Sequence, residues 1–179
     1  MARKLVAYEL LSLDGVAEDP DQFITDWDDV MDENLARVIA TQDTVILGRR
    51  TYNDWAAFWP TSEIEPFATF INGVDKYVVT STTPDDLWAK TSVIGADYVE
   101  HIADLKQRPG GDIGLHGSID LTGTLLAGGL VDELRLVVAP QLQGAGRRLF
   151  DSGVQNRLTL TRSVESPAGY LLLDYAVSG

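Results

Sequence analysis

The sequence predicts an α/β protein whose central sheet is mostly parallel, with helices on both faces and an antiparallel hairpin at the C-terminal end. Over about the first two thirds of the chain, short apolar strand-like runs alternate with helix-like segments. This alternation is typical of parallel sheets covered by helices. Residues 157–164 and 170–177 alternate apolar and polar side chains around Pro167–Gly169, which predicts a hairpin.

Composition indicates one ordinary globular domain. The chain has 179 residues, of which 45% are hydrophobic, enough to bury a core and too many for a disordered chain. We find no linker or internal repeat, so residues 1–179 are expected to form a single domain. The absence of cysteine excludes a disulfide scaffold, a thiolate zinc site and a cysteine nucleophile.

Charge narrows the range of partners. There are 14 Lys and Arg residues against 27 Asp and Glu, a formal net charge of −13. We therefore expect no nonspecific nucleic-acid binding, which depends on cations that contact phosphates. No apolar run reaches the roughly 18 residues of a membrane span, and no signal peptide is evident, so the chain is expected to be cytoplasmic. Two histidines are too few for a histidine-rich metal centre, and no metal is expected.

The first half of the chain alternates strand, helix and strand. Residues 4–13 are largely apolar, which suits a buried central strand, and residues 15–27 form an acidic loop. In the next segment, Met31, Leu35, Val38 and Ile39 share one helical face, and Asp28 and Asp29 suit the positive end of that helix. The expected elements are a helix over 28–41, a strand over 44–47, a helix from near Thr51 and a short helix over 64–72.

The second half continues the same pattern and then changes. Glycine, proline and hydroxyl residues separate the segments. The expected elements are strands over 76–80, 91–94, 112–116 and 134–139, helices over 97–107 and 119–128, and the two hairpin strands.

Three strands end in small or hydroxyl residues, in the segments 48–51, 81–83 and 117–119. Ligands of such sheets bind beyond the carboxyl ends of the strands, and a helix N-terminus suits a phosphate. Arg49 and Arg50 add cationic donors. A dinucleotide lying across these strand ends is one interpretation. The alternative is that Thr51 and Ser118 only cap helices and that the arginines are solvated.

Other candidate residues have stronger structural alternatives. Asp32 lies beside the apolar face of its predicted helix, where a half-buried carboxylate could bind a ring or relay a proton, but it also fits a solvated acidic first turn. His116 ends an apolar strand and could be a general acid, although a packed structural histidine fits better. His101 is expected to be solvated. Arg147 and Arg148 follow the glycines at 144 and 146 and could meet a substrate phosphate, or lie in solvent.

Several ordered segments resemble the dihydrofolate reductase-like superfamily, and most closely the reductase domain of the deaminase-reductases of riboflavin biosynthesis. They span nearly the whole chain in the order found in that family. The matching segments are Ser12–Ala17, Val45–Tyr52, Tyr77–Ser81, Gly117–Ser118, Gly129–Leu136, Ala139–Pro140 and Gly144–Phe150.

This resemblance implies a three-layer fold and an NADPH-dependent reductase that transfers hydride to a C=N or C=O carbon of a pyrimidine- or pteridine-like substrate. It makes Asp32 the candidate catalytic acid and puts Asp14 and Trp27 on the substrate side. Ala17 falls in the loop that would cover the nicotinamide. The implied cofactor-binding residues are Ala17, Gly48, Arg49, Arg50, Thr51, Ser81, Thr82, Gly117, Ser118 and Ile119.

Three functions stay open at this point. The first is a reductase resembling 5-amino-6-(5-phosphoribosylamino)uracil reductase. The second is a dihydrofolate reductase, for which Trp27 and Asp32 have a comparable spacing before Gly48, although His116–Gly117 stands where those enzymes usually show a glycine pair. The third is a catalytically inactive nucleotide-binding module. The resemblance also implies a homodimer.

Overall fold

The chain folds around one eight-stranded sheet, described here from a computed structural model that covers residues 2–85, 87–151, 153 and 155–178. The strand order is β4-β3-β2-β5-β1-β6-β8-β7. Six strands are parallel, and the hairpin of β7 and β8 joins them antiparallel through β6. The strands are β1 (Leu5–Leu11), β2 (Gln42–Gly48), β3 (Asp75–Val79), β4 (Thr91–Ile94), β5 (Asp112–Leu115), β6 (Glu133–Val138), β7 (Leu158–Glu165) and β8 (Leu171–Val177).

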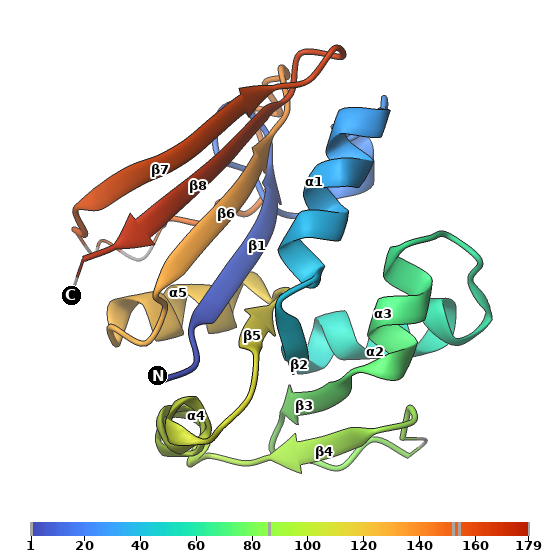
Figure 1. Cartoon of the computed structure of the whole chain (residues 1–179), viewed down its shortest axis with the longest axis vertical. Helices are drawn as coiled ribbons and strands as arrows, with labels where there is room; N and C mark the ends of the chain where they lie inside the picture. Colours follow the sequence, from blue (N-terminus) through green and yellow to red (C-terminus); the bar gives the residue numbers. More distant parts are fainter. Residues whose placement is uncertain (1, 86, 152, 154, 179) are drawn as a thin grey trace.

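Helices cover both faces of this sheet (Figure 1). One apolar cluster packs α4 and α5 against the central strands. Two further clusters pack α1, α2 and α3 against the other face. The helices are α1 (Asp29–Ile39), α2 (Arg49–Phe58), α3 (Phe67–Gly73), α4 (Tyr98–Gln107) and α5 (Ile119–Ala127), with short 3₁₀ turns at Pro20–Gln22 and Trp59–Thr61. The predicted three-layer α/β fold is therefore confirmed.

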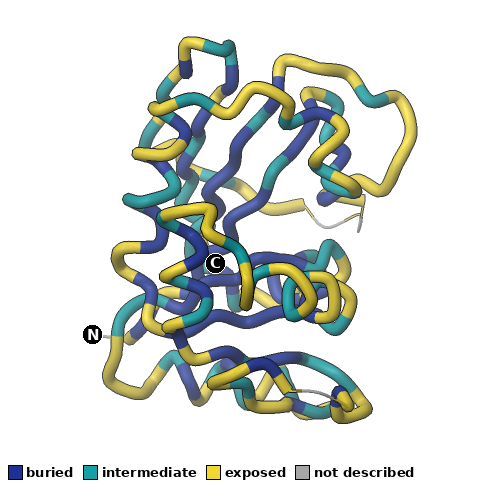
Figure 2. The backbone as a smooth tube through the Cα atoms, turned by 90° about the vertical axis from the view of Figure 1, so that its right-hand side faces the viewer, coloured by how far each residue is buried: buried dark blue, intermediate teal, exposed yellow. Residues whose placement is uncertain are grey.

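The central strands form the core of the molecule. In Figure 2 they run as dark blue, buried segments, while the loops around them are mostly yellow and exposed. The first three residues of β1 show why its sequence is apolar: Leu5, Val6 and Ala7 are fully buried. A parallel strand buried on both faces has no solvent side on which to alternate polar residues.

The boundaries of two helices show how the sequence sets them. Asp28 caps α1, because its Oδ1 accepts a hydrogen bond of 3.0 Å from the Met31 N–H, which satisfies a free donor of the first turn. The predicted start of α2 near Thr51 is wrong by two residues. That helix begins at Arg49, directly after the strand, with Gly48 as its N-cap, so Thr51 is inside the helix and does not cap it.

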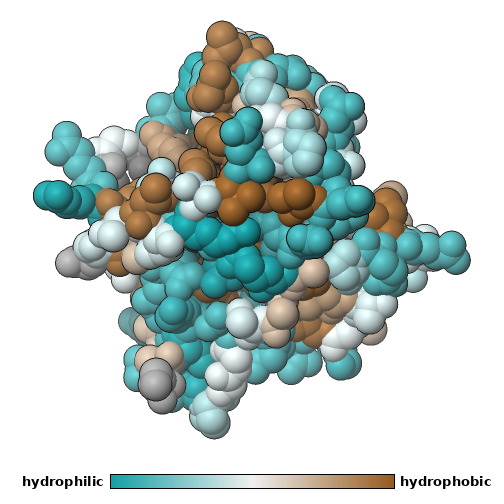
Figure 3. Space-filling view, turned by 45° about the horizontal axis from the view of Figure 1, so that its top comes forward, coloured by the Kyte–Doolittle hydropathy of each residue, from teal (hydrophilic) through white to brown (hydrophobic). Residues whose placement is uncertain are grey.

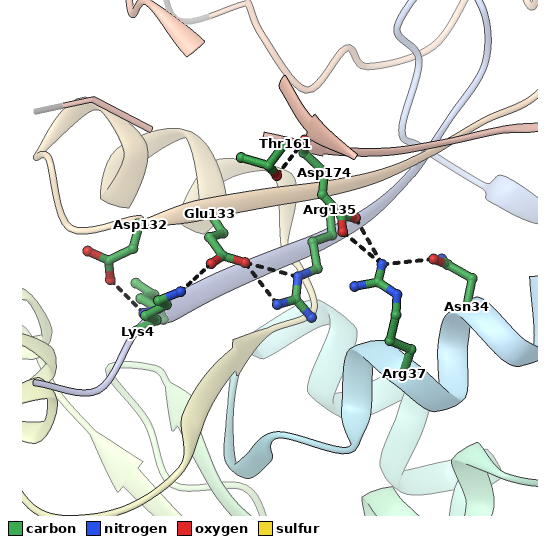
Figure 4. A network of polar contacts seen from close by, with 9 residues as sticks. Lys4, Asn34, Arg37, Asp132, Glu133, Arg135, Thr161 and Asp174 are labelled. Carbon is green, nitrogen blue, oxygen red and sulfur yellow. Dashed lines mark hydrogen bonds and ion pairs between the residues drawn. The ribbon is translucent and has the colours of Figure 1, made fainter. Parts of the chain in front are cut away.

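A polar network ties the C-terminal hairpin to α1 (Figure 4). The Arg37 Nη2 donates to both carboxylate oxygens of Asp174, at 3.0 and 2.9 Å. The Asn34 Oδ1 accepts from Arg37 at 2.9 Å and from Arg162 of β7 at 3.0 Å. Asn34 and Asp174 are both buried, so these bonds replace the water that the polar groups lose on folding.

The outer surface is mixed in character. On the face seen in Figure 3, separate apolar patches lie among hydrophilic residues. Within the described part of the chain, no helix combines the length and the hydropathy that crossing a bilayer requires, and no group of three or more candidate ligands is arranged to hold a metal ion.

Candidate functional site

The carboxyl ends of β2 and β5 touch each other. The Gly48 N–H donates to the Gly117 carbonyl at 3.1 Å, and a Cβ on Gly48 would lie only 2.4 Å from the Ser118 Oγ. Gly117 itself has a φ of 94°, a left-handed conformation that favours glycine, and its peptide bond to Ser118 is cis. Glycine at both positions therefore lets the starts of α2 and α5 approach each other at backbone distance.

Arg49 connects this point to the end of β3. Its Nη1 donates to the Thr80 Oγ1 at 3.1 Å and to the Thr82 carbonyl at 2.5 Å, while its Nε donates to the Asn53 Oδ1 at 2.9 Å. The segments 48–51, 81–83 and 117–119 are thus joined at one edge of the sheet. The strand ends that the sequence singled out do converge.

Two helices start at this edge without a capping side chain. The N-cap of α2 is Gly48, which has no side chain, and the N-cap of α5 is Ser118, whose hydroxyl makes no capping bond. The first-turn N–H groups of both helices are therefore not bound by their own caps. Together with the positive ends of the helix dipoles, such groups bind anions, and phosphates in particular.

A hollow of about 200 Å³ opens beside these helix starts. It lies between the start of α2, the end of β3 and the outer side of α5. Its lining combines apolar side chains with hydroxyl and charged groups: Gly48, Arg49, Val79, Tyr98, Ser118, Asp120, Leu121 and Thr124.

Two loops, 12–18 and 141–149, pair above the end of β1. Val16 forms a β-bridge with Arg148, and the Ala17 N–H donates to the Arg147 carbonyl at 2.9 Å. Asp14 links the two loops, because its carboxylate accepts hydrogen bonds from the N–H groups of Gln143 and Gly144 at 2.9 and 2.8 Å. These bonds hold the pKa of Asp14 well below its ordinary value. The Asp14 carboxylate thus holds the two loops together, and its part in substrate binding stays a prediction.

Arginines surround the same edge despite the acidic net charge. Arg50 is exposed and lies 3.8 Å from the Glu18 carboxylate of the first loop. Arg147 pairs with Asp120 of α5. A second hollow, of about 500 Å³, lies between α5 and the second loop and is also lined by Asp120 and Thr124, so the two hollows adjoin along one helix.

Trp27 and Asp32 contact each other, as their joint assignment to one site requires. The Trp27 indole N–H donates to the Asp32 Oδ1 at 2.6 Å. Asp32 is exposed, however, so the expectation of a half-buried carboxylate is wrong. Its position is that of the alternative, a solvated residue in the acidic start of α1.

His116 is a packed histidine. Its ring lies among those of Tyr8, Trp55, Phe67 and Phe70, at centroid distances of 5.7–6.3 Å. Its Nε2 is 2.8 Å from the Gln42 Oε1. Burial lowers its pKa to about 4, so the ring is neutral at pH 7. His101 is not solvated as expected: its Nε2 is buried, and its ring lies 5.4 Å from that of Tyr77.

A buried carboxyl group that the sequence reading passed over lies on β1. Glu9 is 8% exposed, and its Oε1 accepts a bond of 2.7 Å from the Thr122 hydroxyl of α5. Burial raises its pKa to about 7. The signal was present in the sequence, because Glu9 is the one charged residue between Leu5 and Leu11.

The other residues that sequence reasoning missed lie around the hollow. Asp120 and Thr124 are four residues apart on α5 and so share a face, a spacing that can be read from the sequence. Thr80 and Tyr98 carry no such signal, because the register of β3 and β4 brings them to the site.

Residues 3–172 match the family described as the RibD C-terminal domain. The chain belongs to the RibD C-terminal domain family. The match covers all of the helices and all of the strands except most of β8. The resemblance to reductase domains of this kind, which the ordered segments suggested, is therefore confirmed.

Individual proteins of known sequence or structure agree with the family. YyaP of Bacillus subtilis (strain 168), named as uncharacterized, is 29% identical over 164 residues, which cover 88% of this chain and 85% of YyaP. A pyrimidine reductase-like protein of Corynebacterium diphtheriae is similar in structure, with a TM-score of 0.74 at 15% identity over 99% of this chain and 92% of that one.

The fold extends to the dihydrofolate reductases. The enzyme of Enterococcus faecalis, in a structure with NADP(H) and RAB-propyl, has a TM-score of 0.62 at 16% identity, and each chain is covered completely. At such identities the likeness concerns the fold. The RibD C-terminal domain described here thus has the dihydrofolate reductase-like fold.

Proposed function

We propose that this RibD C-terminal domain is an NADPH-dependent reductase of a pyrimidine- or pteridine-like substrate, resembling 5-amino-6-(5-phosphoribosylamino)uracil reductase. The observation that carries the proposal is the meeting of two uncapped helix N-termini, at Gly48 and Ser118, beside Arg49. Family membership and the E. faecalis structure with NADP(H) support the same cofactor. When bound, the cofactor would supply the hydride.

The residues at this edge fit a phosphorylated adenine dinucleotide. The N–H groups that start α5 would bind the pyrophosphate, and Gly48 leaves space for the backbones to come close to it. Arg49 is already oriented by Asn53 and Thr80, so it would lose little freedom on binding a phosphate. The proposed cofactor-binding residues are Ala17, Gly48, Arg49, Arg50, Thr51, Ser81, Thr82, Gly117, Ser118 and Ile119.

The loop pair would cover the redox end of the cofactor. Ala17 is held by its hydrogen bond to Arg147, and the bond of the Arg147 N–H to Glu18, at 3.2 Å, adds a second tie. A covered site excludes water, which strengthens polar interactions inside it. Trp27 and Asp32 are proposed to contribute on the substrate side, from the exposed start of α1.

Phosphate recognition by Arg50 gives the direct test. Arg50 is exposed and only weakly paired, so Arg50→Gln should fold normally. We expect NADPH binding, followed by its fluorescence, to weaken about ten- to a hundredfold, since a charge-assisted hydrogen bond is worth roughly 1.5–3 kcal/mol. NADH binding, which involves no 2′-phosphate, should stay unchanged. Arg108→Gln, an exposed arginine after α4, is the matched control.

Two results of this titration would contradict the proposal. If the wild-type protein gives no saturable signal with NADPH, the reductase proposal is wrong. If NADPH and NADH bind equally well to all variants, the arginines do not bind the 2′-phosphate of NADPH.

A homodimer belongs to the same proposal. The strand β7 is an edge strand with mostly exposed residues, including Leu160 at 51%, and unpaired edges offer backbone groups to a second chain. Two-fold dimers are the commonest assembly of this kind. Light scattering at several concentrations tests it: a monomer mass throughout would contradict it.

A further inference from the structure

Glu9 is a buried acid without a cationic partner. Among the described residues, Thr122 makes its one side-chain hydrogen bond, and Glu9 takes part in none of the ion pairs of those residues. Burying a carboxyl group in this way is costly if it is charged. An apolar residue would pack in the same place without that cost, so the carboxyl group needs another explanation.

Its position on the strand puts it beside the proposed cofactor site. The pairing of β1 with β5 ends at Ala7 opposite Leu115, and the same register sets Glu9 level with Gly117. The contact with Thr122 puts its side chain on the α5 face of the sheet, under the first turns of that helix. Glu9 therefore lies at the height at which β5 turns into α5.

The connections that leave β1 and β5 diverge at this place. The chain leaving β1 leads to α1 on one face of the sheet, while the chain leaving β5 leads to α5 on the other (Figure 1). Ligands of open α/β sheets bind where neighbouring connections diverge in this way. A dinucleotide whose phosphates lie at Gly48 and Ser118 can extend its redox end from there toward β1, under the loop of Ala17.

We propose that Glu9 faces the nicotinamide ring of the bound cofactor and distinguishes its two redox states by charge, because a carboxylate favours the cationic oxidised ring over the neutral reduced one. The inference rests on the proposed function and names a residue that acts within the same site. Opposite charges in a site shielded from water attract strongly. Glu9 would thus stabilise the positive charge that develops as the hydride leaves.

Among the groups around this place, Glu9 is the one expected to make the preference for NADP⁺ over NADPH depend on pH. Its neighbour in β6, Leu136, is apolar, and α5 offers Thr122. The charged groups of the loops above these strand ends pair with each other and with nearby helices: Asp14 with Arg148, Glu18 with Arg50, and Arg147 with Asp120. His116 lies against Tyr8, on the opposite face of the sheet.

The test compares the two forms of the cofactor. The dissociation constants of NADP⁺ and NADPH are measured by calorimetry at pH 6, 7 and 8 for wild type, Glu9→Gln and Thr122→Val. The ratio of the two constants is the readout, because both forms carry the same 2′-phosphate and its titration cancels. An opposite charge lowers a carboxyl pKa by 1–3 units, and burial raises the pKa of Glu9 to about 7 when no cofactor is bound.

We expect the preference for NADP⁺ over NADPH to rise about five- to tenfold between pH 6 and pH 8 in the wild type. In Glu9→Gln, whose amide oxygen can still accept the Thr122 bond, the ratio should not change with pH. Thr122→Val removes a bond that lowers the pKa of Glu9, so its rise should move to higher pH. A purely structural role of Glu9 would not shift this ratio.

The outcomes separate the two proposals. Tight binding of both forms with a ratio independent of pH in the wild type, or with the same pH dependence in Glu9→Gln, overturns the role of Glu9 and leaves the cofactor proposal in place. Absence of binding to the wild type at every pH overturns both. If Glu9→Gln does not fold, the unshifted profile of Thr122→Val would contradict the inference on its own.

Discussion

Replacing Glu9 with glutamine should make the protein more stable at neutral and alkaline pH. The side chain is buried, and burial raises its pKa from 4.5 to about 7. Between these values the folded protein keeps a proton that the unfolded chain releases, so the wild type loses stability as pH rises through this window. The difference of about 2.5 units, at 1.36 kcal/mol each, is about 3 kcal/mol.

Another buried titratable group, His116, changes the stability with pH in the opposite direction. Burial lowers its pKa from 6.5 to about 4, so the folded protein binds fewer protons than the unfolded chain and gains stability as pH rises from about 4 to 6.5. In the wild type the two contributions nearly cancel over pH 4.5–6.5. In Glu9→Gln the His116 contribution stands alone, and stability should rise across that range.

Urea unfolding of both proteins, followed by circular dichroism at pH 4, 5, 6, 7 and 8, measures this. The free energy of unfolding of Glu9→Gln minus that of the wild type should grow by about 3 kcal/mol from pH 4 to pH 8. The difference isolates Glu9, because all other groups are common to the two proteins. Two curves that stay parallel would show that Glu9 titrates normally and is not desolvated in the folded state.

Three further substitutions test particular contacts. Gly48→Ala should lower the free energy of unfolding by about 1–3 kcal/mol and weaken NADPH binding, since its Cβ would clash with Ser118; the double variant with Ser118→Gly should recover stability, and no recovery would refute the clash. Asp14→Ala should speed hydrogen exchange of the amides that Asp14 binds in the loop at 141–144. Unchanged exchange rates there would show that Asp14 does not hold this loop. Lys76→Met should lower the free energy of unfolding by about 2 kcal/mol, because the buried Nζ donates to two carbonyls at 2.8 and 2.9 Å. Lys90→Met, at an exposed position, should lower it by less. Equal losses in the two variants would contradict this prediction.

Local sequence patterns were sufficient for the elements and their order. The apolar face of α1, its cap at Asp28 and the alternation in the hairpin all depend on neighbours within a few residues, and such signals can be read from the chain. The convergence of the strand ends was also predictable, because carboxyl ends of parallel strands meet at one edge of a sheet.

Contacts between distant segments were not predictable in this way. The partner of His116 is Gln42, on another strand, and their side chains meet over Gly114, where any Cβ would lie 2.1 Å from the amide oxygen. Asp14 reaches a loop that is more than a hundred residues further along. The exposure of Asp32 could not be predicted for a related reason: helical spacing sets the side of α1 on which it lies, but not how far the neighbouring loop covers it.

A crystal structure of the protein soaked with NADP⁺ would show directly whether the strand ends at Gly48 and Gly117 bind the cofactor. We expect the adenosine phosphate at Arg49 and Arg50, the pyrophosphate over the starts of α2 and α5, and the nicotinamide between β1 and β5 within contact distance of Glu9. Electron density for the cofactor at another place, or a cofactor whose phosphates do not touch either helix start, would contradict this expectation.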